Sequence, residues 1–147
     1  MVTPIGQDLD SFWSALLTGA DGISQIERFP VADLRVGQGG EIKKLIRAVD
    51  WRRVPDCRAT RLLVSAADDL CVQAGSRPLD VAPERLAVVV GTALGGVEEG
   101  ERALGGSPRH LAHALDDAPG HGLARWLGAR GPVVTVSTAC ASGATAL

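Results

Sequence analysis

Apolar residues along the chain are arranged first with a helical spacing and later in short uninterrupted runs. The first helical segment begins after Asp8, a residue type that caps helix N-termini, and stops before Gly19. Its apolar residues recur three and four positions apart, which places them on one face of a helix. These residues are Leu9, Phe12, Trp13, Leu16 and Leu17. Residues 20–40 contain several Gly and Asp residues, and we expect a loop there with one short extended piece.

A second amphipathic helix is predicted from about residue 56 to residue 74, with Gly75 and then Pro78 as its stop. The spacing of its apolar residues is that of a helix with one side packed against the rest of the protein. We expect this side to hold Leu62, Leu63, Ala66, Ala67, Leu70, Cys71 and Ala74.

Two short apolar runs predict strands. The run in residues 85–91 is continuous and closed by glycine, so we expect a strand that is buried on both faces. The second run covers residues 133–137. Between the two strands the pattern predicts three helical pieces: one after Gly95-Gly96, one at 107–117 and one at 120–128, the last two separated by Pro119-Gly120. This alternation predicts an α/β fold with a parallel or mixed sheet flanked by helices.

Composition narrows the class of protein. Apolar residues make up 46% and charged residues 22% of the chain, which excludes a disordered protein. No apolar run approaches the ~18 residues that cross a membrane, and no secretory signal is visible at the N-terminus. The aromatic share is 3%, so the core must be built from Ala, Val and Leu. The three cysteines, Cys57, Cys71 and Cys140, lack CxxC spacing, so we expect free thiols and a cytoplasmic protein.

Cys140 is the strongest candidate for chemistry. It follows the second predicted strand and opens a predicted helix, so its sulfur would lie near backbone N–H groups that favour a thiolate and can stabilise an oxyanion. Its neighbours Ala139, Ala141, Ser142 and Gly143 are small and allow a substrate carbonyl to approach. The alternative, from spacing alone, is a buried and unreactive cysteine that serves as a small apolar residue.

Two other patterns give weaker indications of chemistry. His110 and His113 share a helical spacing with His121 nearby, as metal ligands can. Only Asp116 and Asp117 lie at a supporting short spacing, and no cysteine does, so we expect solvated surface histidines and no metal site. The turn at Gly91–Gly96 follows a strand, as a dinucleotide-binding loop does. It lacks the GxGxxG spacing, so we expect a structural turn and no bound cofactor.

Sequence motifs run in a fixed order through nearly the whole chain. They are Val2–Gly6 (VTPIG), Phe12–Leu17 (FWSALL), Gly22-Ile23 with Phe29, Val88–Gly96 (VVVGTALGG) and Gly131–Gly143 (GPVVTVSTACASG). Together they resemble the β-ketoacyl-[acyl carrier protein] synthases, the ketosynthases of fatty-acid and polyketide assembly. The resemblance implies a thiolase-like layered α/β fold. Residues 1–147 would be its N-terminal domain, incomplete at both ends, with the first strand and the C-terminal half missing.

The same resemblance implies that Cys140 accepts an acyl chain as a thioester, with its own N–H as part of the oxyanion hole. The complete enzyme would condense this thioester with malonyl carrier protein in a decarboxylative Claisen reaction, in either fatty-acid or polyketide biosynthesis. The phosphopantetheine thioester of the carrier would be the substrate, with no separate cofactor. The family's two catalytic histidines and lysine match no position here, so we expect the isolated chain to be inactive. A homodimer or a ketosynthase-like heterodimer, built around the strand before the cysteine, is also implied.

Basic residues are concentrated in one segment of a chain whose formal net charge is −2. This basic segment consists of Lys43, Lys44, Arg47, Arg52, Arg53, Arg58 and Arg61, with only Asp50 and Asp56 as acidic residues among them. One interpretation is a solvated face. The other, which the resemblance favours, is docking of the acidic acyl carrier protein. Nucleic acid is disfavoured as a partner because no set of aromatic residues accompanies the basic ones.

The role of the chain stays open between two classes of protein. In the first, it is the catalytic part of a condensing enzyme. In the second, it is a non-catalytic remnant, that is, a dimerisation or carrier-protein-binding module without turnover. Acylation of Cys140 separates the two hypotheses, since only the first requires a competent nucleophile.

Overall fold

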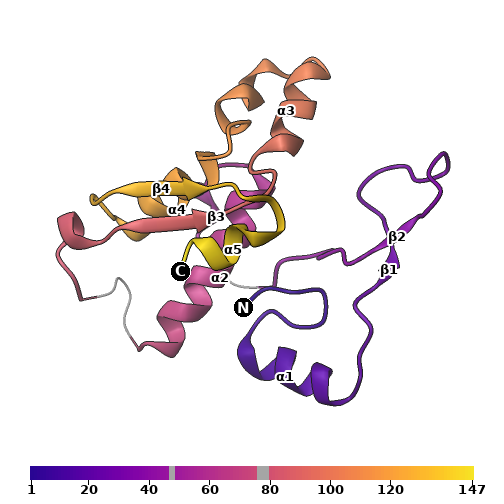
Figure 1. Cartoon of the computed structure of the whole chain (residues 1–147), viewed down its shortest axis with the longest axis horizontal. Helices are drawn as coiled ribbons and strands as arrows, with labels where there is room; N and C mark the ends of the chain where they lie inside the picture. The colour runs from indigo at the N-terminus through magenta and orange to yellow at the C-terminus, as the bar shows by residue number, and fades with distance from the viewer. Residues whose placement is uncertain (47–48, 76–79) are drawn as a thin grey trace. The chain divides into compact units, whose positions relative to one another are not determined.

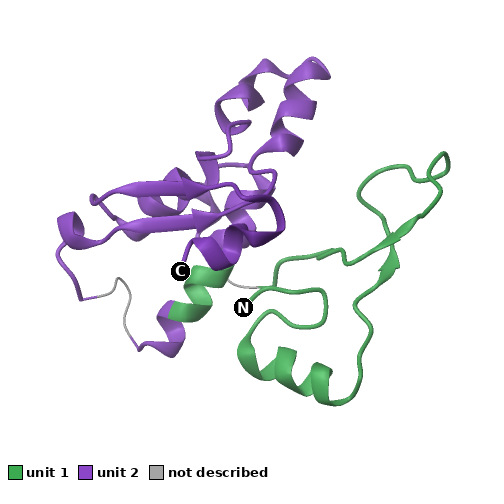
Figure 2. Cartoon of the chain, in the orientation of Figure 1, with its two compact units in different colours: residues 1–49, 65–70 green, residues 50–64, 71–147 purple. Residues whose placement is uncertain are grey.

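The computed structural model of the chain describes residues 1–46, 49–75 and 80–147. The chain divides into two compact units, coloured separately in Figure 2. Unit 1 comprises Met1–Val49 and Ser65–Leu70, and unit 2 comprises Asp50–Val64 and Cys71–Leu147.

Helix α1 (Leu9–Leu17) lies in unit 1 and begins where the sequence predicts. The Asp8 carboxylate accepts a hydrogen bond from the Ser11 N–H at 2.7 Å, and the Ser11 hydroxyl in turn accepts from the Asp8 N–H, which completes a capping box. Gly19 follows the helix with a φ of 71°. The apolar stripe of α1 lies on the surface of the described structure, where Trp13 is 56% exposed.

The extended piece expected within residues 20–40 is present as two short strands of unit 1. Strands β1 (Ser24–Gln25) and β2 (Gln38–Gly39) pair antiparallel. The chain after β2 folds back, and the Glu41 carboxylate accepts hydrogen bonds from the N–H groups of Glu27 and Arg28 at 2.9 and 3.1 Å. One carboxylate therefore satisfies two backbone donors that the short hairpin leaves unpaired.

Helix α2 (Arg58–Gln73) matches the second predicted helix, and Gly75 follows it with a φ of 67°. Pro78, the other predicted stop, lies outside the described residues. The predicted buried face is partly wrong, because Leu70 is 59% exposed. The buried positions mix apolar with polar side chains: Cys57 directly before the helix, and Thr60, Val64, Ser65, Asp68, Asp69 and Cys71 within it. Among the described residues, no helix is both long and apolar enough to cross a membrane.

Unit 2 is organised around strands β3 (Val88–Gly91) and β4 (Val133–Val136), which pair in parallel, as the alternation of elements predicts. Val88 and Val90 are buried, whereas Val89 is 48% exposed. The expectation of a strand buried on both faces is therefore wrong. A continuous valine run does not reveal which of its faces will be covered, because that depends on elements distant in sequence.

Helices α4 (Ala118–Leu127) and α5 (Ser142–Thr145) pack against this two-stranded sheet (Figure 1). A Cβ on Gly120 of α4 would lie 3.3 Å from the Val133 side chain and 3.5 Å from that of Val90, so the helix backbone lies close to the sheet. Pro119 and Gly120 do not separate two helices. They lie in the first turn of α4, where a proline needs no N–H partner.

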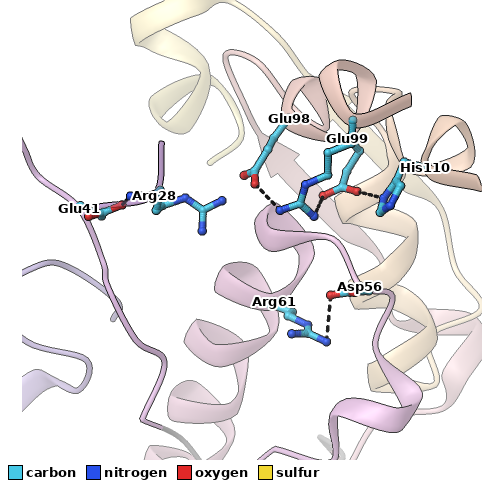
Figure 3. A network of polar contacts seen from close by, with 8 residues as sticks. Arg28, Glu41, Asp56, Arg61, Glu98, Glu99 and His110 are labelled. Atoms are coloured by element: carbon cyan, nitrogen blue, oxygen red, sulfur yellow. Dashed lines mark hydrogen bonds and ion pairs between the residues drawn. The ribbon is translucent and has the colours of Figure 1, made fainter. Parts of the chain in front are cut away.

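A buried carboxylate joins helix α3 (Val97–Leu104) to the 3₁₀ segment η3 (Pro108–His113), as Figure 3 shows. The Glu99 side chain is 1% exposed, its Oε2 lies 2.6 Å from His110 Nδ1, and its Oε1 lies 3.3 Å from Arg102 Nη1. The expectation of a solvated His110 is therefore wrong, since its ring is only 11% exposed. His121 is exposed as expected, at 58% of its side chain.

We expect Glu99→Ala to lower the free energy of unfolding by about 2–3 kcal/mol, because it removes a charged hydrogen-bond partner and leaves His110 Nδ1 buried without its acceptor. Glu98→Ala is the matched control on the same helix. Glu98 pairs with Arg102 in a partly exposed position, so its loss should cost about 0.5 kcal/mol. Urea unfolding followed by circular dichroism measures both values. Equal losses of unfolding free energy for the two variants would show that the buried carboxylate stabilises the protein no more than the exposed one.

We also expect Gly91→Ala to destabilise unit 2 by about 2 kcal/mol or more. A Cβ at Gly91 would lie 2.2 Å from the Ser142 carbonyl oxygen, and backbone cannot move aside as a flexible side chain does. Gly143→Ala, where a Cβ meets nothing within 4 Å, is the control and should be neutral or slightly stabilising. Thermal unfolding compares the two, and a Gly91→Ala protein as stable as the control would refute the close approach.

Candidate functional site

Cys140 lies on a turn directly after β4, in the 3₁₀ segment η4 (Ala139–Ala141). Its side chain is on the surface, whereas Cys57 and Cys71 are buried, and all three are free thiols as the sequence predicts. A buried Cys140 is therefore excluded in this structure. The helix expected after it is short, because α5 contains four residues.

The residue before Cys140 has an unusual backbone conformation. Ala139 has a φ of 50°, the left-handed region, and among the described residues no other non-glycine residue has a positive φ. Such a conformation costs an alanine about 1–2 kcal/mol. It persists only where surrounding contacts hold it, and it is concentrated at functional sites.

The Ser142 hydroxyl holds this turn through three close contacts. Its Oγ accepts a hydrogen bond from the Thr138 N–H at 2.9 Å. It lies 2.7 Å from the Ala139 carbonyl oxygen and 3.0 Å from the Thr92 carbonyl oxygen, both of which can accept its single proton. Ser142 is 3% exposed, so these contacts are shielded from water.

The turn's own hydrogen bonds use the amides after Cys140. The Ala141 N–H donates to the Thr138 carbonyl at 3.1 Å, and the Ser142 N–H donates to the Ala139 carbonyl. The Thr145 hydroxyl donates to the Ala141 carbonyl at 3.0 Å and lies 3.2 Å from the Thr138 hydroxyl. The Cys140 N–H takes no part in these bonds, so it can donate to an oxygen brought in by a ligand.

The glycine-rich turn after β3 is a structural turn, as the sequence predicts. Thr92 Oγ1 accepts a hydrogen bond from the Gly95 N–H at 2.8 Å. A Cβ on Gly95 would lie 2.4 Å from Asp116 Cα, and one on Gly96 would lie 1.9 Å from the His113 carbonyl oxygen. Both glycines are therefore required by close packing of the turn against the backbone of Asp116 and His113.

The basic segment is partly neutralised by its own neighbours. Lys43 pairs with Glu27 in unit 1. In unit 2, Arg61 Nη2 lies 3.1 Å from Asp56 Oδ1 and the guanidinium lies over the Trp51 ring, 5.6 Å from its centroid. Figure 3 includes the Arg61–Asp56 pair.

Arg52 of the basic segment is almost fully accessible, with 92% of its side chain exposed. Its Nε donates to Asp50 Oδ1 at 3.0 Å. This hydrogen bond, together with the Asp50 charge, raises the pKa of Arg52 above its ordinary value. Arg47 lies outside the described residues, and the side chain of Arg53 lies outside them as well. Lys44 is exposed, and Arg58 is half-buried.

A cavity of about 290 Å³ lies in unit 1, with Gln7, Asp21, Glu41 and Lys43 among its lining residues. Its lining includes no residue of the Cys140 turn.

Sequence reasoning found Cys140, but it missed the roles of Ala139 and Ser142, which it treated only as small neighbours. It also missed Glu99, whose partner His110 lies eleven positions away.

The sequence profile described as "Beta-ketoacyl synthase, N-terminal domain" matches residues 1–147. The chain is 30% identical to 3-oxoacyl-[acyl-carrier-protein] synthase I, chloroplastic, from Arabidopsis thaliana, over 97% of this chain and 33% of the relative. It is 28% identical to 3-oxoacyl-[acyl-carrier-protein] synthase 2 from Vibrio harveyi, over 97% of this chain and 37% of the relative. The chain therefore spans only about a third of the length of these curated relatives.

Two solved structures have the same fold. The ishigamide ketosynthase/chain length factor superposes with a TM-score of 0.77 at 21% identity, over 93% of this chain and 38% of that one. A ketosynthase in complex with its chain length factor, from Xenorhabdus doucetiae, gives 0.76 at 25% identity, over 99% of this chain and 39% of that one. The expected thiolase-like α/β fold class is thereby confirmed. The chain belongs to the β-ketoacyl synthase family, and residues 1–147 correspond to that family's N-terminal domain.

Proposed function

We propose that Cys140 is the acyl-accepting nucleophile of a 3-oxoacyl-[acyl carrier protein] synthase, an acyltransferase of fatty-acid or polyketide biosynthesis. The observation that carries this proposal is the exposed Cys140 thiol on a strained, internally hydrogen-bonded turn, at the end of a strand in a chain of this family. Strain held by surrounding contacts is characteristic of groups that must be presented in one geometry.

The acyl transfer step needs only Cys140 and an acyl thioester. The Cys140 thiol loses its proton, and Sγ attacks the carbonyl carbon of an acyl group carried on phosphopantetheine. The tetrahedral intermediate collapses with cleavage of the carrier's C–S bond. The carrier thiolate leaves and takes up a proton, and the acyl group remains on Cys140 as a thioester. We assign no separate cofactor, because phosphopantetheine arrives as part of the substrate.

The Cys140 N–H is suited to stabilise the oxyanion of that intermediate. The neighbouring amides of Ala141 and Ser142 are used within the turn, whereas the Cys140 N–H is outside its hydrogen bonds. A single oxyanion-hole donor contributes about 10²–10³ in rate in an acyl-transfer enzyme where it has been removed. The thioester oxygen would therefore be bound by the residue that attacks its carbon.

Condensation is the step expected of the complete enzyme. Malonyl carrier protein would lose CO₂, and the resulting carbanion would attack the Cys140 thioester. A β-ketoacyl carrier would form and the cysteine would be regenerated. The family's two histidines and lysine match no position in residues 1–147. We therefore propose that this chain alone performs the transfer step at most and does not condense.

The basic segment is the proposed docking region for the acyl carrier protein. It comprises Lys43, Lys44, Arg47, Arg52, Arg53, Arg58 and Arg61. Exposed ion pairs contribute about 0–1 kcal/mol, so Arg52 can exchange Asp50 for a carboxylate of the partner at little cost. Such exposed charges contribute mainly to the association rate and to orientation.

We further propose that the complete protein pairs with a second copy of itself or with a ketosynthase-like partner. Two solved structures similar to this chain, those of the ishigamide and Xenorhabdus doucetiae proteins, are of a ketosynthase with a chain length factor. The alternative function, a non-catalytic binding module, keeps this pairing and the carrier contact but requires no reaction at Cys140.

Incubation with acyl carrier protein thioester is expected to add one acyl group to the chain, detected by intact-mass spectrometry. Cys140→Ala should lower the yield of adduct by about tenfold or more, because the nucleophile is lost. Cys71→Ala, which removes a buried thiol, should retain the adduct. A folded wild-type chain without adduct, or an equal adduct on Cys140→Ala, would favour the binding module.

Arg52→Glu combined with Arg53→Glu is expected to weaken carrier-protein binding by about tenfold at low ionic strength, and by less at high salt, because the contribution is electrostatic. Arg125→Glu with Arg130→Glu is the matched control, with the same change in net charge outside the basic segment. Titration with carrier protein, followed by fluorescence anisotropy, measures both affinities. If both double variants weaken binding equally, the effect comes from net charge and not from the basic segment. If Arg52→Glu with Arg53→Glu leaves the affinity unchanged, the carrier protein does not dock on the basic segment.

A further inference from the structure

We propose that Ser142 is a positioning residue for Cys140, whose buried hydroxyl sets the direction of the Cys140 N–H. The hydroxyl connects three parts of the chain: the end of β3, the start of the turn, and the peptide group between Ala139 and Cys140. The catalytic consequence rests on the proposed acyl transfer, whereas the hydrogen-bonded arrangement itself does not.

The Ala139 carbonyl is the contact through which Ser142 acts. This carbonyl and the Cys140 N–H belong to one peptide group, which is planar and in which C=O and N–H point in opposite directions when it is trans. The Ser142 Oγ lies 2.7 Å from the Ala139 carbonyl oxygen and holds it on the buried side of the turn. The N–H of Cys140 is thereby directed away from Ser142, to the side on which Cys140 is exposed.

The Thr92 carbonyl supplies a fixed reference for this arrangement. Thr92 directly follows β3, and its own N–H donates to the Val136 carbonyl of β4 at 3.0 Å. The Ser142 Oγ lies 3.0 Å from the Thr92 carbonyl oxygen. Gly91 leaves no room between strand and turn, since a Cβ there would overlap the Ser142 backbone. The turn is therefore positioned by the sheet and not by its own residues alone.

The left-handed backbone of Ala139 is strained, so the arrangement depends on the Ser142 hydroxyl to hold it. Without the Ser142 hydroxyl, the Ala139 carbonyl keeps the Ser142 N–H as its donor but loses the hydroxyl contact. Rotation of the Ala139 backbone to a negative φ would then relieve about 1–2 kcal/mol of strain by rotating the following peptide group. The Cys140 N–H would then turn away from its proposed acceptor, while the Cys140 sulfur would remain exposed. Loss of the hydroxyl should therefore affect acyl transfer, which develops an oxyanion, more than a reaction that develops none.

The experiment compares Ser142→Ala with wild type by three measurements on the full 147-residue chain. The Thr138 N–H, which donates to Ser142 Oγ, should exchange with solvent at least about tenfold faster in the variant. The Thr92 N–H, which is bonded to Val136, should keep its rate. The maximal rate of Cys140 acylation should fall about tenfold or more, with the half-saturating concentration unchanged within about twofold. Alkylation of Cys140 by iodoacetamide, which needs no oxyanion, should change by less than about threefold.

Two control variants separate positioning from general destabilisation. Val64→Ala removes buried side-chain volume from α2 and lowers stability, but it should leave both Cys140 reactions unchanged at temperatures where the chain is folded. In an Ala139→Gly background the left-handed conformation carries no penalty, so adding Ser142→Ala should slow acylation by less than about threefold. If Ser142→Ala alone does not fold, the Ala139→Gly pair provides the same comparison of Thr138 exchange.

The outcomes distinguish this inference from the proposed function. Unchanged Thr138 exchange, or equal losses of acylation and alkylation, would overturn the role of Ser142. An equal loss of acylation with and without Ala139→Gly would also overturn it. A wild-type chain that is alkylated at Cys140 but never acylated would refute the proposed function. The Thr138 exchange rates would still decide whether Ser142 holds the turn.

Discussion

The contact between the end of β3 and the Cys140 turn is the constraint on which the rest of the site depends. Gly91 allows two stretches of backbone to meet where any Cβ would overlap the other. The Ser142 hydroxyl then closes that contact, because its single proton can be donated to the carbonyl of Thr92 or of Ala139, which both lie within hydrogen-bond distance. A buried hydroxyl with all its partners stabilises one arrangement, because each alternative leaves a polar group unsatisfied. The strained conformation of Ala139 is held by this closure.

Much of the fold could be predicted because its signals are local. Asp8 caps α1 through an atom three residues away, and Gly75 ends α2 by its own backbone conformation. The burial of each face could not be predicted in the same way. Leu70 is apolar but exposed, and Val89 sits in an apolar run with an open face. Which side of an element is covered depends on segments distant in the sequence, and apolarity alone does not identify them.

At the site, too, features with a local sequence signal could be predicted, whereas features that depend on distant contacts could not. Cys140 could be found from its motif, since the residue type and its place after a strand suggest a nucleophile. Ser142 could not, because its hydrogen-bond partner Thr92 lies 50 positions earlier and a serine after a cysteine has no distinctive signature. The left-handed Ala139 was equally hidden, because alanine rarely adopts that conformation. For His110, the partner of Glu99, the expectation from the sequence is wrong. The weak metal-site pattern of the histidines leads to the expectation of solvated side chains, yet His110 is held by a carboxylate on another element.

The parallel pairing of β3 and β4 also has a consequence for how the protein folds. The chain between the two strands contains α3, η3 and α4, and closing a loop of about 40 residues costs about 3 kcal/mol of chain entropy. Helix α3 and η3 can associate before that closure because their contacts are close in sequence. The Cys140 turn has no sheet to pack against until β3 and β4 have paired. Formation of the strained Cys140 turn thus has to wait for a slow, long-range pairing of strands. In a partly folded chain, Cys140 is an ordinary cysteine.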